Sequence, residues 1–253
     1  MNLMDELLGG AIGHYGLAGS FETLKELVQR IHVWGDEKDA SISNGDFSGE
    51  YGGDIYADLC IGRCFVDAAC SQTVVAAICP FIESLFTRAF AIMRPAWQAG
   101  SAIKSHLRWT KQLKPGDEYK RWSPSWVFNV KSYPRQGFIE GTQQLLEALG
   151  FGSAIPTDSP EFNLVSALFL YRNKSLHHGY EWPTDPLNAF KLNMDAASRK
   201  DSRWQQWFDI STIGADLWMI TITKQLVVDS LGAMQSIATS LREIENEILL
   251  LSK

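Results

Sequence analysis

Several features that would assign this chain to a familiar class are missing from its sequence. The first eight residues carry two acids, Asp5 and Glu6, and no base, so we expect no signal peptide. The longest uncharged stretch of the most apolar segment, residues 68–82, is too short to span a bilayer as a helix. No alternating series of apolar and polar residues predicts a strand or a hairpin. Together these absences predict an all-α, cytoplasmic protein with no membrane partner.

Cysteine and net positive charge are also scarce. All four cysteines lie between residues 60 and 79, and Cys60 and Cys64, four residues apart, could in principle share a metal ion. A structural zinc site needs four ligands, and no histidine or second cysteine pair lies close enough in the sequence to complete one. We therefore interpret the cysteines as buried free thiols and expect neither a metal nor another cofactor. The net charge of −6 argues against a protein that coats nucleic acid through bulk charge.

What the sequence does contain is enough apolar material for a large helical core. With 253 residues, of which 45% are hydrophobic, the chain can form a single domain over residues 1–253. Apolar residues recur at helical spacing in several stretches, and the longest stretch contains Pro80, which should kink or split its helix. The expected helices cover residues 20–34, 54–93, 136–149 and 213–251, with a loop at 36–53 and irregular or weakly helical chain at 183–203. A further helix is expected to start at Pro160 and to lead into Arg172-Asn173.

Charge is unevenly distributed along the chain. Residues 1–58 contain eleven acids and three bases, whereas residues 94–135 contain nine bases and two acids, with tryptophans and tyrosines between the bases. Nucleic-acid grooves combine bases with aromatic platforms in this way. The same aromatics could instead fill a local core beneath a solvated charged face, and both interpretations stay open. On the first interpretation, the candidate nucleic-acid ligands are Lys104, Arg108, Lys111, Lys114, Lys120, Arg121, Lys131 and Arg135.

The most informative stretch of the chain is Arg172-Asn173-Lys174-Ser175-Leu176-His177-His178-Gly179-Tyr180. It follows an apolar run, residues 162–171, and precedes Trp182-Pro183, which a helix would not continue through. Arginine binds phosphate in a bidentate way, and histidine titrates near neutral pH. An arginine, an amide and two imidazoles at the end of a buried helix therefore suit phosphodiester chemistry better than packing.

Arg172-Asn173, followed by three residues and then His177, resembles the signature of the HEPN superfamily, which is an arginine, often an asparagine directly after it, and a histidine a few residues on. The resemblance implies a HEPN-like helical bundle with a core at residues 54–93 and 137–251. Residues 94–135 would be an irregular basic and aromatic insertion, and residues 1–53 an N-terminal helical extension and loop. Family members include toxins of toxin–antitoxin and abortive-infection systems and the nuclease lobes of RNA-guided ribonucleases. The resemblance thus implies an endoribonuclease with an RNA substrate and an antitoxin or defence-system partner.

The resemblance also implies a metal-independent mechanism in which the RNA 2′-hydroxyl attacks the adjacent phosphorus. His177 would act as general acid or base, Arg172 would stabilise charge on the phosphate oxygens, and Asn173 would orient a histidine. In the family the site forms across a homodimer, with one arginine and one histidine from each chain. The spacing agrees, because five helical residues separate Arg172 and His177 by about 140°. His178 is a rival for the same role, since Arg172, His178 and Tyr180 match an Arg…His-x-Tyr pattern found in toxin members.

Other interpretations of these residues stay open. The two histidines could simply cap the last carbonyls of a helix. Arg172 could form a structural ion pair with Glu83, which interrupts the apolar run of the long helix, or Glu83 could be an accessory polar member of the site. For the protein as a whole, the alternatives to a nuclease are a non-catalytic HEPN module that binds RNA or a partner protein, and a purely structural helical interaction protein.

Overall fold

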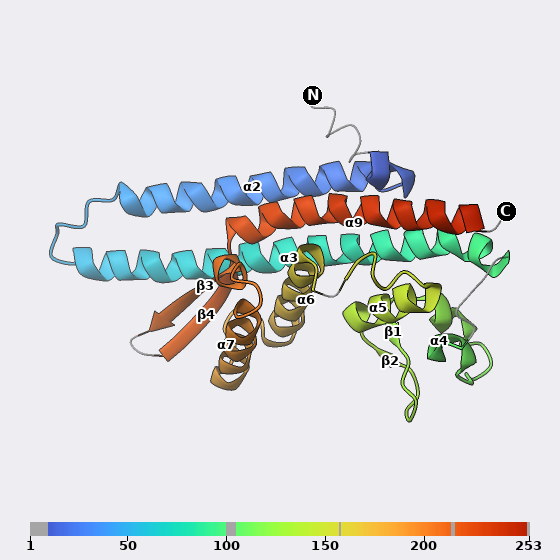
Figure 1. Cartoon of the computed structure of the whole chain (residues 1–253). Coiled ribbons are helices and arrows are strands. Elements are labelled where there is room, and N and C mark those ends of the chain that lie inside the picture. The colour runs from blue at the N-terminus through green and yellow to red at the C-terminus, as the bar shows by residue number, and fades with distance from the viewer. Residues whose placement is uncertain (1–9, 100–104, 157, 214–215, 252–253) are drawn as a thin grey trace. The chain divides into compact units, whose positions relative to one another are not determined.

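The structure, a computed structural model, describes residues 10–99, 105–156, 158–213 and 216–251. Helices dominate it, with two small antiparallel sheets of two strands each (Figure 1). The long helices are α2 (Ala18–Ser43), α3 (Gly52–Ala99), α6 (Pro160–His178) and α9 (Lys224–Leu251). The shorter elements are α4 (Leu107–Thr110), the 3₁₀ turn η1 (Glu118–Trp122), β1 (Trp126–Val127), β2 (Arg135–Gln136), α5 (Phe138–Leu149), α7 (Thr184–Ser198), α8 (Trp204–Trp207), β3 (Phe208–Ile213) and β4 (Asp216–Ile222). The mainly α-helical class predicted from the sequence is confirmed.

The chain forms two compact units, each assembled from segments that are distant in the sequence. Their described residues fall, for unit 1, within 1–21, 80–166 and 232–253, and, for unit 2, within 22–79 and 167–231. The division crosses α3 just before Pro80 and α9 just before Gly232. It also crosses α2 after Phe21 and α6 after Ser166.

Unit 1 has a core of apolar side chains on the second part of α3. Ile82, Leu85, Phe86 and Phe90 recur at helical spacing and are almost fully buried. The ring of Phe86 stands 5.8 Å from the ring of Phe138, the first residue of α5, in an edge-to-face contact. α5 thus packs on α3 through the end at which its chain enters from β2, which pairs antiparallel with β1.

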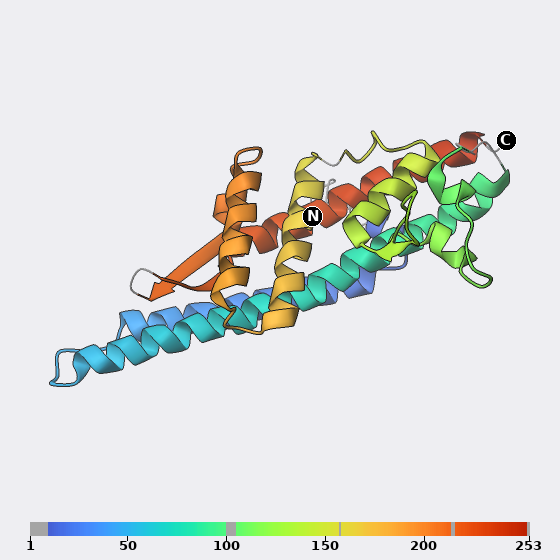
Figure 2. The same ribbon diagram turned by 90° about the horizontal axis from the view of Figure 1, so that it is seen from below.

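Unit 2 is centred on Tyr171 of α6. Its ring lies 5.4 Å from the ring of Trp182, 6.1 Å from that of Phe190 in α7 and 5.9 Å from that of Phe208 in β3. The end of α6 and α7 lie side by side in both views (Figures 1 and 2). β3 and β4 form an antiparallel hairpin with a shift of register between Ser211 and Thr212. This packing fixes the last turns of α6, which carry the Arg172–Tyr180 stretch.

The hairpin is the main departure from the sequence-based expectation of an all-α chain. Residues 213–222 were expected to open the last helix, but residues 216–222 form β4, and α9 begins only at Lys224. In β4 the consecutive residues Met219, Ile220 and Thr221 are all buried, so the strand lacks the alternation that reveals a half-buried strand. Thr223 marks the true helix start, because its Oγ1 accepts the N–H of Leu226 at 3.3 Å.

Other helix boundaries also differ from the expected ones. α2 continues past Gly35 to Ser43, where a loop was expected, and residues 184–198 form α7 rather than irregular chain. α3 passes through Pro80 as one helix, so the proline does not split it. Local helix propensities are weak guides on their own.

α3 is long and apolar enough, over Gly52–Pro95, to cross a membrane, and 44% of its most apolar window is buried in the structure. Buried core helices meet the same criterion, so this is weak evidence for a span. The first turns of α3 nevertheless expose large apolar side chains, among them Ile55 at 52% and Leu59 at 38%. They form an exposed apolar surface, together with Tyr51, Tyr56, Ile61 and Phe65.

Candidate functional site

The Arg172–Tyr180 stretch occupies the last two turns of α6 and the cap that ends it. Gly179 adopts a left-handed φ of +73° and donates its N–H to the Ser175 carbonyl at 2.9 Å. Trp182 Nε1 then donates to the Gly179 carbonyl at 3.0 Å, and the Trp182 ring is buried against Phe190 at 5.4 Å. The end of α6 is therefore held by a glycine cap and an indole anchor.

Tyr171, directly before the motif, ties this part of α6 to the hairpin. Its hydroxyl donates to the Ile220 carbonyl of β4 at 3.0 Å. Burial raises the pKa of the Tyr171 phenol above its ordinary value, so the group stays a neutral donor. Because Tyr171 is fixed, the direction in which each following side chain leaves the helix is fixed as well.

The motif residues do not converge within one chain. Arg172 is half-buried, with its guanidinium carbon 4.4 Å from the centre of the Phe169 ring. Asn173 and His177 are exposed and lie one turn apart, so they share a face that is turned about 100–140° from the direction of Arg172. His178 is half-buried, and its ring centre lies 6.4 Å from that of His177. The helix therefore presents the arginine and either histidine in different directions.

The two accessory candidates lie outside these two turns. Tyr180 follows the glycine cap and is 46% exposed. Glu83 is half-buried on the part of α3 that belongs to unit 1, whereas Arg172 belongs to unit 2. Pairing of Glu83 with Arg172 therefore stays a prediction.

Arg108, a predicted nucleic-acid ligand, is instead a core residue, and that prediction is wrong. Its side chain is fully buried, and its two terminal nitrogens donate to five backbone carbonyls. The acceptors are the carbonyls of Lys120, Arg121, Ser123, Trp126 and Gly141, at 2.6–3.1 Å. Burial lowers the pKa of Arg108 to about 9, which leaves it cationic at neutral pH. Both terminal nitrogens are used by the protein itself, and the remaining donor, Nε, is buried, so no donor is left for phosphate.

Three further bases within residues 94–135 also make hydrogen bonds or ion pairs inside the protein. Arg121 donates to the carbonyls of Arg108, Trp109 and Lys111 at 2.5–2.9 Å and pairs with Glu118. Lys120 is 7% exposed, with its ammonium 4.1 Å from the Trp126 ring centre and 3.1 Å from Asp117. Lys111 Nζ donates to the carbonyls of Asn129 and Val130. Lys120 is buried, so its assignment as a nucleic-acid ligand is wrong, whereas Lys111 and Arg121 are half-buried and their assignment stays a prediction.

The tryptophans of the same segment form a local core. The rings of Trp97, Trp109 and Trp122 lie 4.5–5.1 Å apart from one another. This arrangement supports the interpretation in which the aromatics fill a core, not that in which they stack bases. Of the remaining predicted ligands, Lys114, Lys131 and Arg135 are exposed, and Arg135 pairs with Glu140. Lys104 lies outside the described residues.

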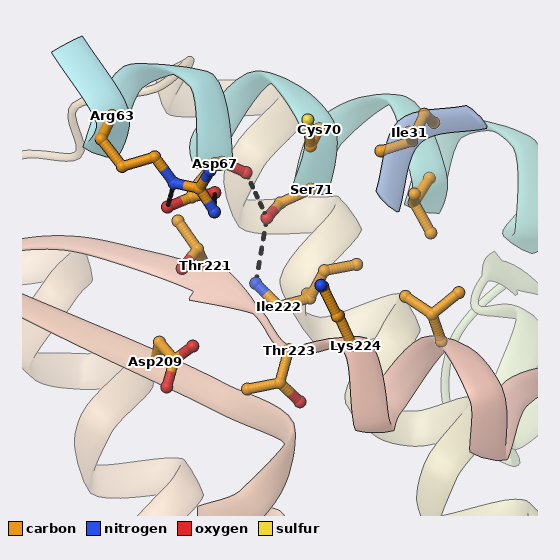
Figure 3. A pocket seen from close by; sticks show the side chains of 12 residues that line it. Ile31, Arg63, Asp67, Cys70, Ser71, Asp209, Thr221, Ile222, Thr223 and Lys224 are labelled. Atoms are coloured by element: carbon orange, nitrogen blue, oxygen red, sulfur yellow. Dashed lines mark hydrogen bonds and ion pairs between the residues drawn. The ribbon is translucent and has the colours of Figure 1, made fainter. Parts of the chain in front are cut away.

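A cavity that the sequence did not reveal lies in unit 2, between α3 and the β3–β4 hairpin (Figure 3). Its volume is about 270 Å³, and its charged walls are Arg63 and Asp67 of α3, Asp209 of β3 and Lys224 of α9. The remaining lining residues are Ile31, Cys70, Ser71, Val74, Thr221, Ile222, Thr223 and Val227. None of the Arg172–Tyr180 residues lines it. No short-range sequence signal could have found this cavity, because its walls combine residues within 31–74 with residues within 209–227.

Cys60, Cys64, Cys70 and Cys79 are all free thiols, as expected from the sequence, but the expected burial is wrong for the first three, which are half-buried. Cys64 donates weakly to Ser211 of β3 at 3.7 Å, and Cys79 is buried. Comparison of the chain with protein-family models, with curated proteins and with solved structures finds no match.

Proposed function

We propose that this protein is a HEPN-type, metal-independent endoribonuclease that acts as a homodimer. The observation that carries the proposal is the arrangement of the Arg172, Asn173 and His177 side chains at the capped end of α6. A phosphate-binding arginine and an exposed histidine leave the helix in different directions, with an amide one turn before the histidine. A site that needs both groups must then draw them from two chains, as the HEPN resemblance implies.

The surroundings of His177 support a contact with a second copy. Leu176, its neighbour, is 69% exposed, and Tyr180 beyond the cap is 46% exposed. Exposed large apolar side chains beside a functional group are typical of surfaces that another protein covers. A twofold axis near His177 would bury both side chains and would bring the Arg172 of one copy toward the His177 of the other.

The chemistry assigned to this composite site balances without a cofactor. The RNA 2′-oxygen forms a bond to the adjacent phosphorus while the bond from phosphorus to the 5′-oxygen breaks, which leaves a cyclic phosphate and a 5′-hydroxyl. His177 of one copy would remove the 2′ proton or protonate the leaving oxygen, and both tasks need a group that titrates near neutral pH. Arg172 of the other copy would hold the phosphate oxygens as their charge builds up.

The test is RNA cleavage in the presence of EDTA, with the single variants Arg172→Ala and His177→Ala and an equimolar mixture of the two. Each variant alone should be inactive. In the mixture, half of the dimers carry both variants and each of these has one complete site, so about one quarter of wild-type activity should return. His178→Ala is the matched control and should retain activity if His177 is the acid or base. Equal activity of wild type and both single variants would contradict the proposal.

A non-catalytic module that binds RNA would give a different pattern. RNA would then be retained in a gel shift without cleavage products, and Lys114→Glu with Lys131→Glu would weaken retention. We further propose a role in toxin activity or antiviral defence, with an antitoxin as partner. Expression of wild type in a bacterial host should then arrest growth, and expression of His177→Ala should not.

A further inference from the structure

We propose that the cavity of unit 2 binds a small organic cation, a primary amine with a short apolar chain. This inference does not rest on the nuclease proposal, because no residue of the Arg172–Tyr180 stretch lines the cavity. It rests on the charges, the hydrogen-bonding groups and the apolar surface that the cavity walls present (Figure 3).

Most of the charge around the cavity is already neutralised within the protein. Arg63 holds Asp67 through two contacts, Nε to Oδ2 and Nη2 to Oδ1, each at 2.9 Å. Lys224 pairs with Asp36 of α2. Asp209 also lines the cavity and has no hydrogen-bond or ion-pair partner among the described residues. Asp209 is exposed, so water can reach its carboxylate, but no cation within the described residues pairs with it, and a cationic ligand could form a charge-assisted hydrogen bond there.

Thr221 places a second acceptor next to this carboxylate. The residue is 6% exposed, its hydroxyl has no hydrogen-bond partner within the described part of the chain, and it lines the cavity. Thr221 is the direct cross-strand partner of Asp209 in the hairpin, so the two side chains leave the sheet on the same face. An ammonium group carries three donors and could satisfy both. Ser71, by contrast, already donates to the Asp67 carbonyl at 2.6 Å and accepts the Ile222 N–H at 3.0 Å.

The rest of the wall fits a short hydrocarbon chain. Ile31, Val74 and Val227 line the cavity and come from three different helices. Ligand sites typically combine such apolar surface with a few polar groups that fix orientation. The volume of about 270 Å³ lies just below the usual range of ligand pockets, which restricts the ligand to a few carbon atoms. A carboxylate ligand would meet Asp209 and would have to displace Asp67 or Asp36 from its cation.

The test is calorimetric titration with three probes of equal length, n-butylamine, n-butanol and butyrate. The amine should bind with a dissociation constant of about 1 mM, as suits so few atoms, and at least about tenfold more tightly than the alcohol. Butyrate should not bind. Asp209→Asn should weaken amine binding about tenfold, and Thr221→Val should weaken it severalfold.

Matched controls come from the far end of the same hairpin. Asp216→Asn and Thr212→Val alter exposed residues that do not line the cavity, and both variants should bind the amine as wild type does. Bound amine should also slow alkylation of Cys70, which lines the cavity, relative to Cys60, which does not. Equal binding of amine and alcohol, tighter binding of butyrate, no heat from the amine, or undiminished binding by Asp209→Asn would each overturn the proposal.

Discussion

The buried cation of Arg108 connects several parts of the segment before α5. Its fork joins carbonyls from η1, from β1 and from α5, and no carboxylate among the described residues neutralises it. We expect Arg108→Met to lower the free energy of unfolding by about 3–5 kcal/mol, because five buried acceptors lose their donors. Arg135→Met, which removes an exposed ion pair with Glu140, should change it by less than about 1 kcal/mol. Urea unfolding followed by tryptophan fluorescence measures both, and equal stability of the two variants would refute this role for Arg108.

Two helical glycines offer a second matched comparison. A Cβ on Gly141 would lie 2.2 Å from the Pro124 carbonyl oxygen, so Gly141→Ala should lower the free energy of unfolding by about 2 kcal/mol or more. A Cβ on Gly232 of α9 would meet nothing within 4 Å, so Gly232→Ala should stabilise the protein by about 0.5–1 kcal/mol through its better helix propensity. Thermal melting of the two variants should show shifts of opposite sign.

At the scale of elements, the contact between α6 and β4 through Tyr171 should depend on pH. The raised pKa means that the folded protein keeps the phenol proton above pH 10, where the unfolded chain loses it. Unfolding then releases a proton, so the free energy of unfolding falls as the pH rises above 10. Tyr171→Phe removes the hydrogen bond to the Ile220 carbonyl, so its free energy of unfolding should be about 1 kcal/mol lower than that of wild type at neutral pH. Above pH 10 the free energy of unfolding of the variant should fall less steeply than that of wild type. Tyr119→Phe, at an exposed tyrosine, should match wild type in urea titrations at both pH values.

The same elements show how far the sequence could be used for prediction. Helical spacing was enough to find the long helices, since residues such as Leu85 and Phe86 repeat on one buried face. It failed at β4, where neighbouring residues are buried on both faces, and after Gly35, where α2 continues to Ser43. The glycine cap at Gly179 was foreseeable from the His-His-Gly sequence. The burial of Arg108 was not, because its acceptors are backbone carbonyls, which every residue has.

At the scale of the whole molecule, the first turns of α3 form a surface with exposed large apolar side chains. Ile55 and Leu59 are exposed on the same helix on which Ile82 is buried. We expect Ile55→Ser with Leu59→Ser to change the free energy of unfolding by less than about 1 kcal/mol and to reduce the binding of a hydrophobic dye. Ile82→Ser should instead cost about 3 kcal/mol or more, because it leaves a cavity and a buried hydroxyl. A large loss of stability in the double variant would show that these side chains are covered.

The hydrogen bonds from Arg108 to five backbone carbonyls also limit how this chain could have evolved. The Arg108 side chain lies in the segment before α5 and donates to the Gly141 carbonyl within α5. Deletion of residues 105–136 would therefore remove a hydrogen bond on which α5 depends. A descendant that loses the part of the segment from Arg108 to Trp126 also loses the close approach of backbones that requires a glycine at position 141. Arginine at 108 and glycine at 141 should therefore be inherited or lost together.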